Sequence, residues 1–221
     1  VSFPKNAADM YMARELVRAA GGKALMIAKI ERYEAIGNLE EILKASDGIM
    51  VARGDLAVEV GDAAVPALQK RMIRMAKELN RVTITATQMM ESMIEAPVPT
   101  RAEVSDVANA VLDGTDAVML SAETAAGKYP VETIEAMARV CVEADRSEIV
   151  SFDTAFLHRT FSRIDQSIAM SALFVAHHMK VKAVVSLTES GSTALWMSRL
   201  DSGVPIYALT PLESSRRRMC L

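Results

Sequence analysis

The sequence predicts an α/β protein in which parallel strands are joined by crossover helices. Short apolar stretches alternate along the chain with longer segments whose apolar residues recur at helical spacing. The first four of these stretches end in polar residues, Glu31, Asp55, Thr87 and Glu123, which lie about 24 to 36 residues apart. This interval is the length of a strand–helix repeat, so both observations indicate a parallel sheet covered by helices.

The composition narrows the class of protein. The chain has 221 residues, enough for one or two domains with a sizeable core, and its net charge of −3 gives no indication of nucleic-acid binding. No run approaches the roughly 18 apolar residues of a membrane span, and we expect no cleavable signal at residues 1–5. Two cysteines form no disulfide framework. Cys141 lies on an apolar helical stripe, which predicts an inert core thiol in a reducing cytoplasm.

The expected elements of the first part of the chain follow in order. Strands are expected at residues 25–30, 48–53, 82–86 and 117–120. Helices are expected at residues 13–20, 39–43, 65–79 and 104–111, and from Pro130 onward. Gly21-Gly22 and Asp113-Gly114 are expected to end helices, and residues 1–3 to be the end of a further strand.

The pattern lapses between about residues 146 and 165 and then resumes. A helix over 168–179, a strand at 183–187, a helix at 192–202, a strand at 206–209 and the start of another helix are expected there. We therefore predict a first domain over residues 1–146, a connection over 147–164 and a second, partial α/β domain over 165–221.

Polar residues two positions apart close each of the four strands and are expected to share a face. The pairs are Lys29 with Glu31, Arg53 with Asp55, Thr85 with Thr87, and Ser121 with Glu123. Each pair alone is more often an ordinary ion pair, turn or strand end. Their repetition favours a single site, because the carboxyl ends of parallel strands meet at one edge of a sheet.

The residue types at this edge predict the chemistry of the site. Glu31 and Asp55 offer hard oxygen ligands that suit Mg²⁺ or Mn²⁺, and the lack of a nearby histidine or cysteine argues against zinc. Lys29 supplies a positive charge for a phosphate or a developing oxyanion. The main-chain N–H groups of Gly54 and Asp55, with the hydroxyl of Thr87, can hold a carboxylate or phosphate. We predict a small, doubly anionic substrate bridged to a divalent cation.

Five segments of the sequence resemble the pyruvate kinase family, most closely its bacterial branch. They are Lys29-Ile30-Glu31, Ala45–Leu56, Thr85–Met93, Pro99–Gly114 and Ser121–Ala125. The resemblance covers essentially the whole chain in family order. It implies the C-terminal half of a (β/α)₈ TIM barrel followed by part of an α/β C-terminal domain. Ala57 and Ala122 stand where the family has glycine.

The resemblance implies phosphoryl transfer from phosphoenolpyruvate to ADP, giving pyruvate and ATP. Lys29 would stabilise the transferring phosphoryl group and the enolate oxygen, while Glu31 and Asp55 would hold Mg²⁺ or Mn²⁺. Arg53, Gly54 and Asp55 belong with Lys29 and Thr87 to the expected substrate-binding set. The family's K⁺ site and much of its nucleotide contact would lie outside this segment. We therefore expect the isolated chain to lack measurable kinase activity.

The resemblance also implies a proton relay and an effector site. Thr87 would belong to the relay that converts enolate to pyruvate, with Ser121 and Glu123 as its outer part. A sugar-phosphate or nucleotide effector would bind the loop that contains Thr188, Ser190, Gly191, Ser192 and Thr193. Plain capping of the next helix by Ser190 or Ser192 is the alternative for this loop.

Partners and rival functions follow from the same residues. A half barrel leaves two unpaired sheet edges, and the family implies a tetramer, so a homo-oligomer is expected. Neither nucleic acid nor membrane is an expected partner. Two other functions stay open. One is another metal-dependent barrel enzyme of enolate chemistry, such as an aldolase or lyase. The other is a non-catalytic phosphate-binding or assembly module.

Overall fold

The computed structural model describes residues 1–147, 161, 163–200 and 202–220. The chain divides into two compact units, Val1–Asp145 and Arg146–Leu221, and each is described by itself. Most of the predicted connection at residues 147–164 lies outside the described residues.

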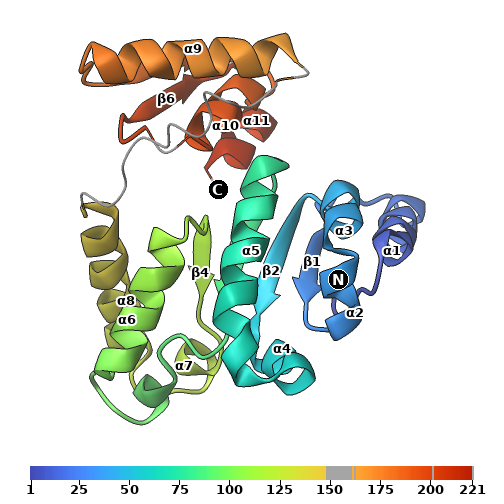
Figure 1. The fold of residues 1–221 in the computed structure, drawn as a ribbon, viewed down its shortest axis with the longest axis vertical. Coiled ribbons are helices and arrows are strands. Elements are labelled where there is room, and N and C mark those ends of the chain that lie inside the picture. Colours follow the sequence, from blue (N-terminus) through green and yellow to red (C-terminus); the bar gives the residue numbers. More distant parts are fainter. Residues whose placement is uncertain (148–160, 162, 201, 221) are drawn as a thin grey trace. The chain divides into compact units, whose positions relative to one another are not determined.

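A parallel sheet forms the centre of the first unit (Figure 1). In the described part of this unit its strands, in spatial order, are β1 (Ile27–Ile30), β2 (Gly48–Ala52), β3 (Val82–Ala86) and β4 (Ala117–Met119). Each neighbouring pair is parallel, which confirms the predicted α/β class. Residues 1–3 run along the free edge of β1 without forming a regular strand. The N–H of Lys29 donates to the carbonyl of Val1 over 2.9 Å.

Helices connect these strands. They are α1 (Ala7–Ala19), α2 (Tyr33–Gly37), α3 (Leu39–Ala45), α4 (Arg53–Val60), α5 (Val65–Glu78), α6 (Arg101–Leu112), α7 (Ala122–Ala125) and α8 (Pro130–Asp145), with 3₁₀ turns η1 (Asp62–Ala64) and η2 (Glu91–Ile94). The sequence pattern missed α2, α4 and α7, because helices of five, eight and four residues are too short to display a period. Figure 1 shows α4 and α7 following β2 and β4 at one end of the sheet.

The two faces of the sheet differ in burial. Ala28, Ile30, Ile49 and Val51 are fully buried in a core that includes residues of α1, α3, α4 and α5. On the other face the strand register aligns Lys29 with Met50, and Met50 with Ile84, and all three are only half-buried. The helices thus cover one face, and the opposite face stays more open, as expected for half of a barrel.

Cys141 is half-buried on α8 and packs against a second apolar cluster centred on Met90, Met93 and Met137. Burial raises the pKa of its thiol, and the nearby Asp145 raises it further. A raised pKa reduces the fraction of reactive thiolate, which agrees with the predicted inert thiol. The stripe around it is less buried than expected, since Ile134 is exposed.

The second unit contains another parallel pair of strands. Its described elements are α9 (Ile164–His178), β5 (Val184–Leu187), α10 (Ser192–Ser198), β6 (Ile206–Leu209) and α11 (Glu213–Met219). Its core gathers Ala169 and Leu173 of α9 with Met197 and Leu200. The predicted helix at 192–202 ends earlier, at Ser198.

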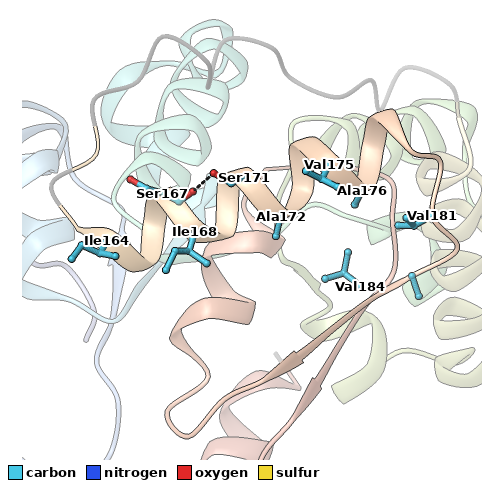
Figure 2. A pocket seen from close by; sticks show the side chains of 10 residues that line it. Ile164, Ser167, Ile168, Ser171, Ala172, Val175, Ala176, Val181 and Val184 are labelled. Atoms are coloured by element: carbon cyan, nitrogen blue, oxygen red, sulfur yellow. Dashed lines mark hydrogen bonds between the residues drawn. The ribbon is translucent and has the colours of Figure 1, made fainter.

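An open apolar hollow of about 750 Å³ lies along α9 in this unit (Figure 2). Its lining is aliphatic apart from Ser167 and Ser171, and Ser171 already donates its hydroxyl hydrogen bond to the Ser167 carbonyl. A surface of this kind lacks the charged groups that an anionic substrate requires. None of the helices in the described ranges combines the length and the apolar character needed to span a membrane.

Candidate active site

Lys29 and Glu31 form an ion pair at the end of β1. The ammonium Nζ lies 2.6 Å from Oε1 of Glu31, whose side chain is fully buried, whereas the Lys29 side chain is 34% exposed. Oε2 of Glu31 accepts a 2.8 Å hydrogen bond from the N–H of Phe3. Oε1 pairs with the Lys29 ammonium and accepts no further hydrogen bond from the described residues. The negative charge of the Glu31 carboxylate is therefore balanced by the Lys29 ammonium.

Gly54 and Asp55 lie in the first turn of α4, directly after β2. We expected a strand to continue to Arg53, and this is wrong: the strand ends at Ala52 and the helix begins at Arg53. No side chain of the described residues caps this helix start. A Cβ at Gly54 would lie 3.7 Å from the hydroxyl oxygen of Thr87, so the glycine leaves room beside that hydroxyl.

Thr87 follows β3 in a left-handed backbone conformation. Its φ is 67°, and the φ of the next residue, Gln88, is 56°. This region is unfavourable for a β-branched residue and is maintained only where surrounding contacts enforce it. The Thr87 hydroxyl donates to the carbonyl of Ala86 over 2.6 Å and accepts from the N–H of Gly54 over 2.9 Å. The expected proximity of Gly54 and Thr87 is therefore present.

The side chain of Arg53 points into the protein. The residue is 5% exposed. Its guanidinium contacts the carbonyls of Ala86 and Thr87, Sδ of Met89, Oε1 of Gln69 and the carboxylate of Asp106. All these contacts are within the chain, so substrate binding by Arg53 stays a prediction, and the structure gives this side chain a different, internal role.

Glu123 is buried in the short helix α7, with an exposed fraction of 3%. One carboxylate oxygen accepts a 2.7 Å hydrogen bond from the N–H of Ser121, and the other accepts a 3.4 Å bond from the N–H of Met90. Ser121 itself is exposed. Glu123 thus connects the end of β4 with the loop after β3, which contains Thr87.

Thr85 lies on the face opposite to the expected one. The register aligns it with Val51 and Val118, on the face covered by helices, where it is fully buried. Its hydroxyl donates to that of Thr115 over 3.0 Å. Thr85 and Thr87 were expected to share a face, but the left-handed backbone at Thr87 breaks the alternation of the strand.

The register also relates the two candidate metal ligands. Ile30 is aligned with Val51, so Glu31 and Ala52 come next on neighbouring strands, and Asp55 follows in the first turn of α4. Among the described residues, no group of three or more histidine, cysteine, aspartate or glutamate side chains is placed to hold a metal. A cation here would have two carboxylate ligands at most, with substrate and water oxygens completing its shell, which is the usual situation for Mg²⁺.

The expected effector loop of the second unit is closed by its own hydrogen bonds. The Thr188 hydroxyl accepts from the N–H of Gly191 over 2.9 Å. The Ser190 hydroxyl donates to that of Ser192 over 3.2 Å and accepts from the N–H of Ser192 over 3.4 Å. The N-cap position of α10 is Gly191, with Ser192 and Thr193 in the first helical turn. Phosphate binding by this loop stays a prediction.

Comparison with known proteins assigns the chain to a family. A model described as pyruvate kinase, barrel domain, matches residues 1–134, and one described as pyruvate kinase, alpha/beta domain, matches residues 166–221. The chain belongs to the pyruvate kinase family. The resemblance of the sequence motifs is thereby confirmed, together with the barrel and α/β classes of the two units.

Curated bacterial pyruvate kinases are similar along almost the whole chain. The pyruvate kinase of Haemophilus influenzae is 56% identical over 95% of this chain and 45% of its own length. Pyruvate kinase II of Salmonella typhimurium is 55% identical over 96% and 45%, and the pyruvate kinase of Thermotoga maritima is 42% identical over 100% and 47%. The chain spans about half the length of the curated relatives it matches.

The contacts made by two acidic residues of the first unit were not predicted from the sequence. Glu103 bonds the N–H and hydroxyl of Ser92, and with Thr100 it forms a capping box at the start of α6. The spacing of Thr100 and Glu103 is a known capping signature and could have revealed this link. Asp106 pairs with Arg53, 53 positions away in the chain, and no local pattern signals such a contact.

Proposed function

We propose that this chain supplies the phosphoenolpyruvate-binding side of an active site that transfers a phosphoryl group to ADP, giving pyruvate and ATP. The ion pair of Lys29 with the buried Glu31 carries the proposal, because it lies at the end of a strand whose neighbour leads into Gly54 and Asp55. This arrangement favours a small substrate with two anionic groups. Membership of the pyruvate kinase family supports that choice of substrate.

Glu31 and Asp55 are the proposed ligands of a divalent metal, Mg²⁺ or Mn²⁺. The residues fit such an ion, since both are carboxylates, the buried Oε1 of Glu31 has the Lys29 ammonium as its only partner among the described residues, and Asp55 is exposed. When bound, the metal would neutralise negative charge on the phosphate and enolate oxygens of the substrate. By the resemblance to the family, a K⁺ site would lie outside the residues of this chain.

The chain's own groups orient the substrate and balance its charge. The Lys29 ammonium, held by its contact with Glu31, would stabilise the transferring phosphoryl group and the enolate oxygen. The N–H groups of Gly54 and Asp55 at the start of α4 would bind the carboxylate. The carboxylate would then replace the Thr87 hydroxyl as acceptor of the Gly54 N–H, and the hydroxyl would donate to the substrate by turning its hydrogen away from the Ala86 carbonyl.

Conversion of the enolate to pyruvate needs a proton, and we propose that Thr87 belongs to the relay that delivers it. Ser121 and Glu123 form its outer part in this proposal. The buried Glu123 accepts hydrogen bonds from the N–H groups of Ser121 and Met90, so it connects the loop of Thr87 with Ser121.

Calorimetric titration of the chain with phosphoenolpyruvate, with and without Mn²⁺, tests the proposal. We expect binding that requires Mn²⁺ and is lost in Asp55→Asn. Asp62→Asn is a matched control, because Asp62 is an exposed aspartate just beyond the same helix. Binding that is independent of Mn²⁺, or unchanged by Asp55→Asn, would contradict the assignment.

Turnover gives a separate test. We expect no measurable turnover by the isolated chain in a coupled assay for pyruvate, because the nucleotide contacts and half of the barrel lie outside it. Robust turnover by the chain alone would overturn this expectation.

A second candidate is a non-catalytic phosphate-binding or assembly module. Such a module would bind phosphate without needing Mn²⁺, Glu31 or Asp55. An aldolase or lyase of enolate chemistry would share the metal requirement. Only the kinase would require ADP together with phosphoenolpyruvate when the rest of the barrel is present.

The loop 188–193 and the assembly of the protein belong to the same proposal. We propose that a sugar-phosphate or nucleotide effector binds at this loop. We also propose that the functional state is a homo-oligomer and that the reaction takes place in the cytoplasm. The hydroxyls of Thr188, Ser190 and Ser192 and the N–H groups around Gly191 support the first of these. Calorimetry with sugar phosphates on the Ser190→Ala variant tests it, with Ser198→Ala at the end of α10 as control.

A further inference from the structure

We propose that Arg53 is a positioning residue for Thr87. Its buried guanidinium holds the Thr87 main chain in the left-handed conformation that presents the hydroxyl to Gly54. This inference rests on the proposed function, because it assigns a second role to a residue of the same site. Arg53 acts through Thr87 and need not contact the substrate.

The contacts of the guanidinium converge on the end of β3. Nη2 donates to the carbonyl of Thr87 over 2.6 Å, and Nε donates to the same oxygen over 3.2 Å. Nε also lies 3.4 Å from the carbonyl of Ala86, and Nη2 lies 2.7 Å from Sδ of Met89. A charged donor pair on one carbonyl fixes the orientation of that peptide group.

That peptide group is where the chain leaves the strand. Thr87 and Gln88 both have positive φ, and neither is glycine. Two successive non-glycine residues keep a left-handed backbone conformation only when surrounding contacts hold them in it. Of the hydrogen bonds described for this turn, those from Arg53 to the Thr87 carbonyl come from a charged and buried donor.

The other end of the guanidinium is fixed in turn. Nη1 lies 2.6 and 2.7 Å from the two carboxylate oxygens of Asp106 on α6, and 3.5 Å from Oε1 of Gln69 on α5. The Arg53 side chain is 6% exposed and that of Asp106 is 39% exposed, so the buried charge is balanced by an anion that keeps some solvent. Arginine can serve both ends at once because its donors are arranged in a planar fork, whereas lysine carries a single point of charge.

Consecutive residues therefore hold Thr87 from two sides. The Arg53 side chain bonds the Thr87 main chain, and the Gly54 main chain bonds the Thr87 side chain. Since both come from the first turn of α4, the helix start and the hydroxyl are positioned together. The donors and the hydroxyl proposed to bind the substrate carboxylate would thus be set as one unit.

Amide hydrogen exchange of Gly54, followed by NMR on the full chain, tests the inference without substrate. In Arg53→Lys we expect the Gly54 amide to exchange about tenfold faster, the factor expected when one ordinary hydrogen bond is lost. We also expect weaker Mn²⁺-dependent binding of phosphoenolpyruvate. Exchange at residues of α1 and α3 should stay unchanged, because the hydrogen bonds described for Arg53 go to other elements.

Arg14→Lys is the matched control. Arg14 also donates to a main-chain carbonyl, that of Ala45, and to a carboxylate, that of Asp47, in the same unit. It should change exchange around α1 and leave that of Gly54 as in the wild type. If Arg53 were merely structural, Arg53→Lys would lower the stability of the protein without a selective effect on the exchange of Gly54.

The outcomes separate the two proposals. Folded Arg53→Lys with wild-type exchange at Gly54 overturns the positioning role, whatever happens to phosphoenolpyruvate binding. Absence of phosphoenolpyruvate binding in the wild type counts against the proposed function and leaves the exchange result to decide the role of Arg53. If Arg53→Lys does not fold, Asp106→Asn with Gln69→Ala loosens the far end of the guanidinium, and unchanged exchange at Gly54 in that variant overturns the inference.

Discussion

The main-chain N–H of Gly54 donates a 2.9 Å hydrogen bond to the hydroxyl of Thr87, 33 residues further along the chain. The bond joins the first turn of α4 to the turn that follows β3. It combines the two kinds of group, an amide donor and a hydroxyl, that we propose for binding a carboxylate. Changes to either partner should therefore affect binding more than folding.

Replacing Thr87 by valine should remove the acceptor of this bond while keeping a β-branched side chain of similar size. We expect a loss of about 1 kcal/mol in the free energy of unfolding and a marked loss of Mn²⁺-dependent phosphoenolpyruvate binding. Chemical denaturation and calorimetry measure the two effects. Thr87→Ser keeps the hydroxyl and should retain most of the binding. Equal binding by the valine and serine variants would argue against a role for the hydroxyl.

Replacing Gly54 by alanine should block the space beside Thr87 without unfolding the protein. The added Cβ would meet the Thr87 hydroxyl oxygen at 3.7 Å, an ordinary van der Waals contact, and alanine is favoured over glycine in a helix by about 0.5–1 kcal/mol. We therefore expect stability equal to or above that of the wild type and weaker phosphoenolpyruvate binding. Gly37→Ala is the control, since a Cβ there would meet none of the described atoms within 4 Å. Full binding by Gly54→Ala would show that the space is unused.

Replacing Glu31 by glutamine should remove the charge from the buried end of β1. The amide keeps an oxygen for the N–H of Phe3 but leaves the Lys29 ammonium without its counter-charge. We expect the affinity for Mn²⁺, measured by electron paramagnetic resonance, to fall at least tenfold. A loss of about that size is typical even when only a group that supports a metal ligand is removed. Glu40→Gln, which breaks the exposed pair with Lys44, should not change it. Unaltered Mn²⁺ binding in Glu31→Gln would remove Glu31 from the proposed ligands.

Acid should weaken the contact between Glu103 and Ser92. Burial raises the pKa of the Glu103 carboxyl, but hydrogen bonds from Ser92 and Thr100 outweigh it, so the pKa lies below its ordinary value. A depressed folded-state pKa means that the carboxylate stabilises the protein above its unfolded-state pKa and loses this contribution as the pH falls through the folded-state value. The wild type should therefore be more stable than Glu103→Gln at neutral pH.

Thermal unfolding of both proteins across the acid range measures this difference. It should shrink as the pH falls and reach its minimum below the folded-state pKa of Glu103. Glu143→Gln on the exposed side of α8 is the control and should show little difference from the wild type. A stability difference that does not change with pH would mean that the charge of Glu103 is unimportant.

Much of the fold could be predicted because the apolar periodicity of long helices and the composition of strands are local signals in the sequence. The strands β1 to β4 and the helices α5, α6 and α8 lie close to the expected ranges. The start of α4 could not be predicted in this way. Its eight residues are too few to show a clear stripe, and Arg53-Gly54-Asp55 reads equally well as a turn.

The candidate site was partly predictable for a related reason. Lys29 and Glu31 keep the strand alternation, so their pairing followed from sequence spacing. Thr85 was assigned to the wrong face, because nothing in the sequence around Thr87 signals two non-glycine residues of positive φ. The inward direction of Arg53 depends on Asp106 and Met89, which the chain places far away in sequence and the fold brings together.

The adjacency of Arg53 and Gly54 has a practical meaning for protein engineering. A single residue inserted between Arg53 and Gly54 would turn the rest of α4 by about 100° relative to Arg53, so that the Arg53 side chain and the Gly54 N–H could no longer both bond Thr87. Substitutions at Val58, which is 87% exposed on the same helix, should be well tolerated. Variants or chimaeras can thus be changed at Val58 on the later part of α4, but should preserve Asp55 and the spacing at the beginning of the helix.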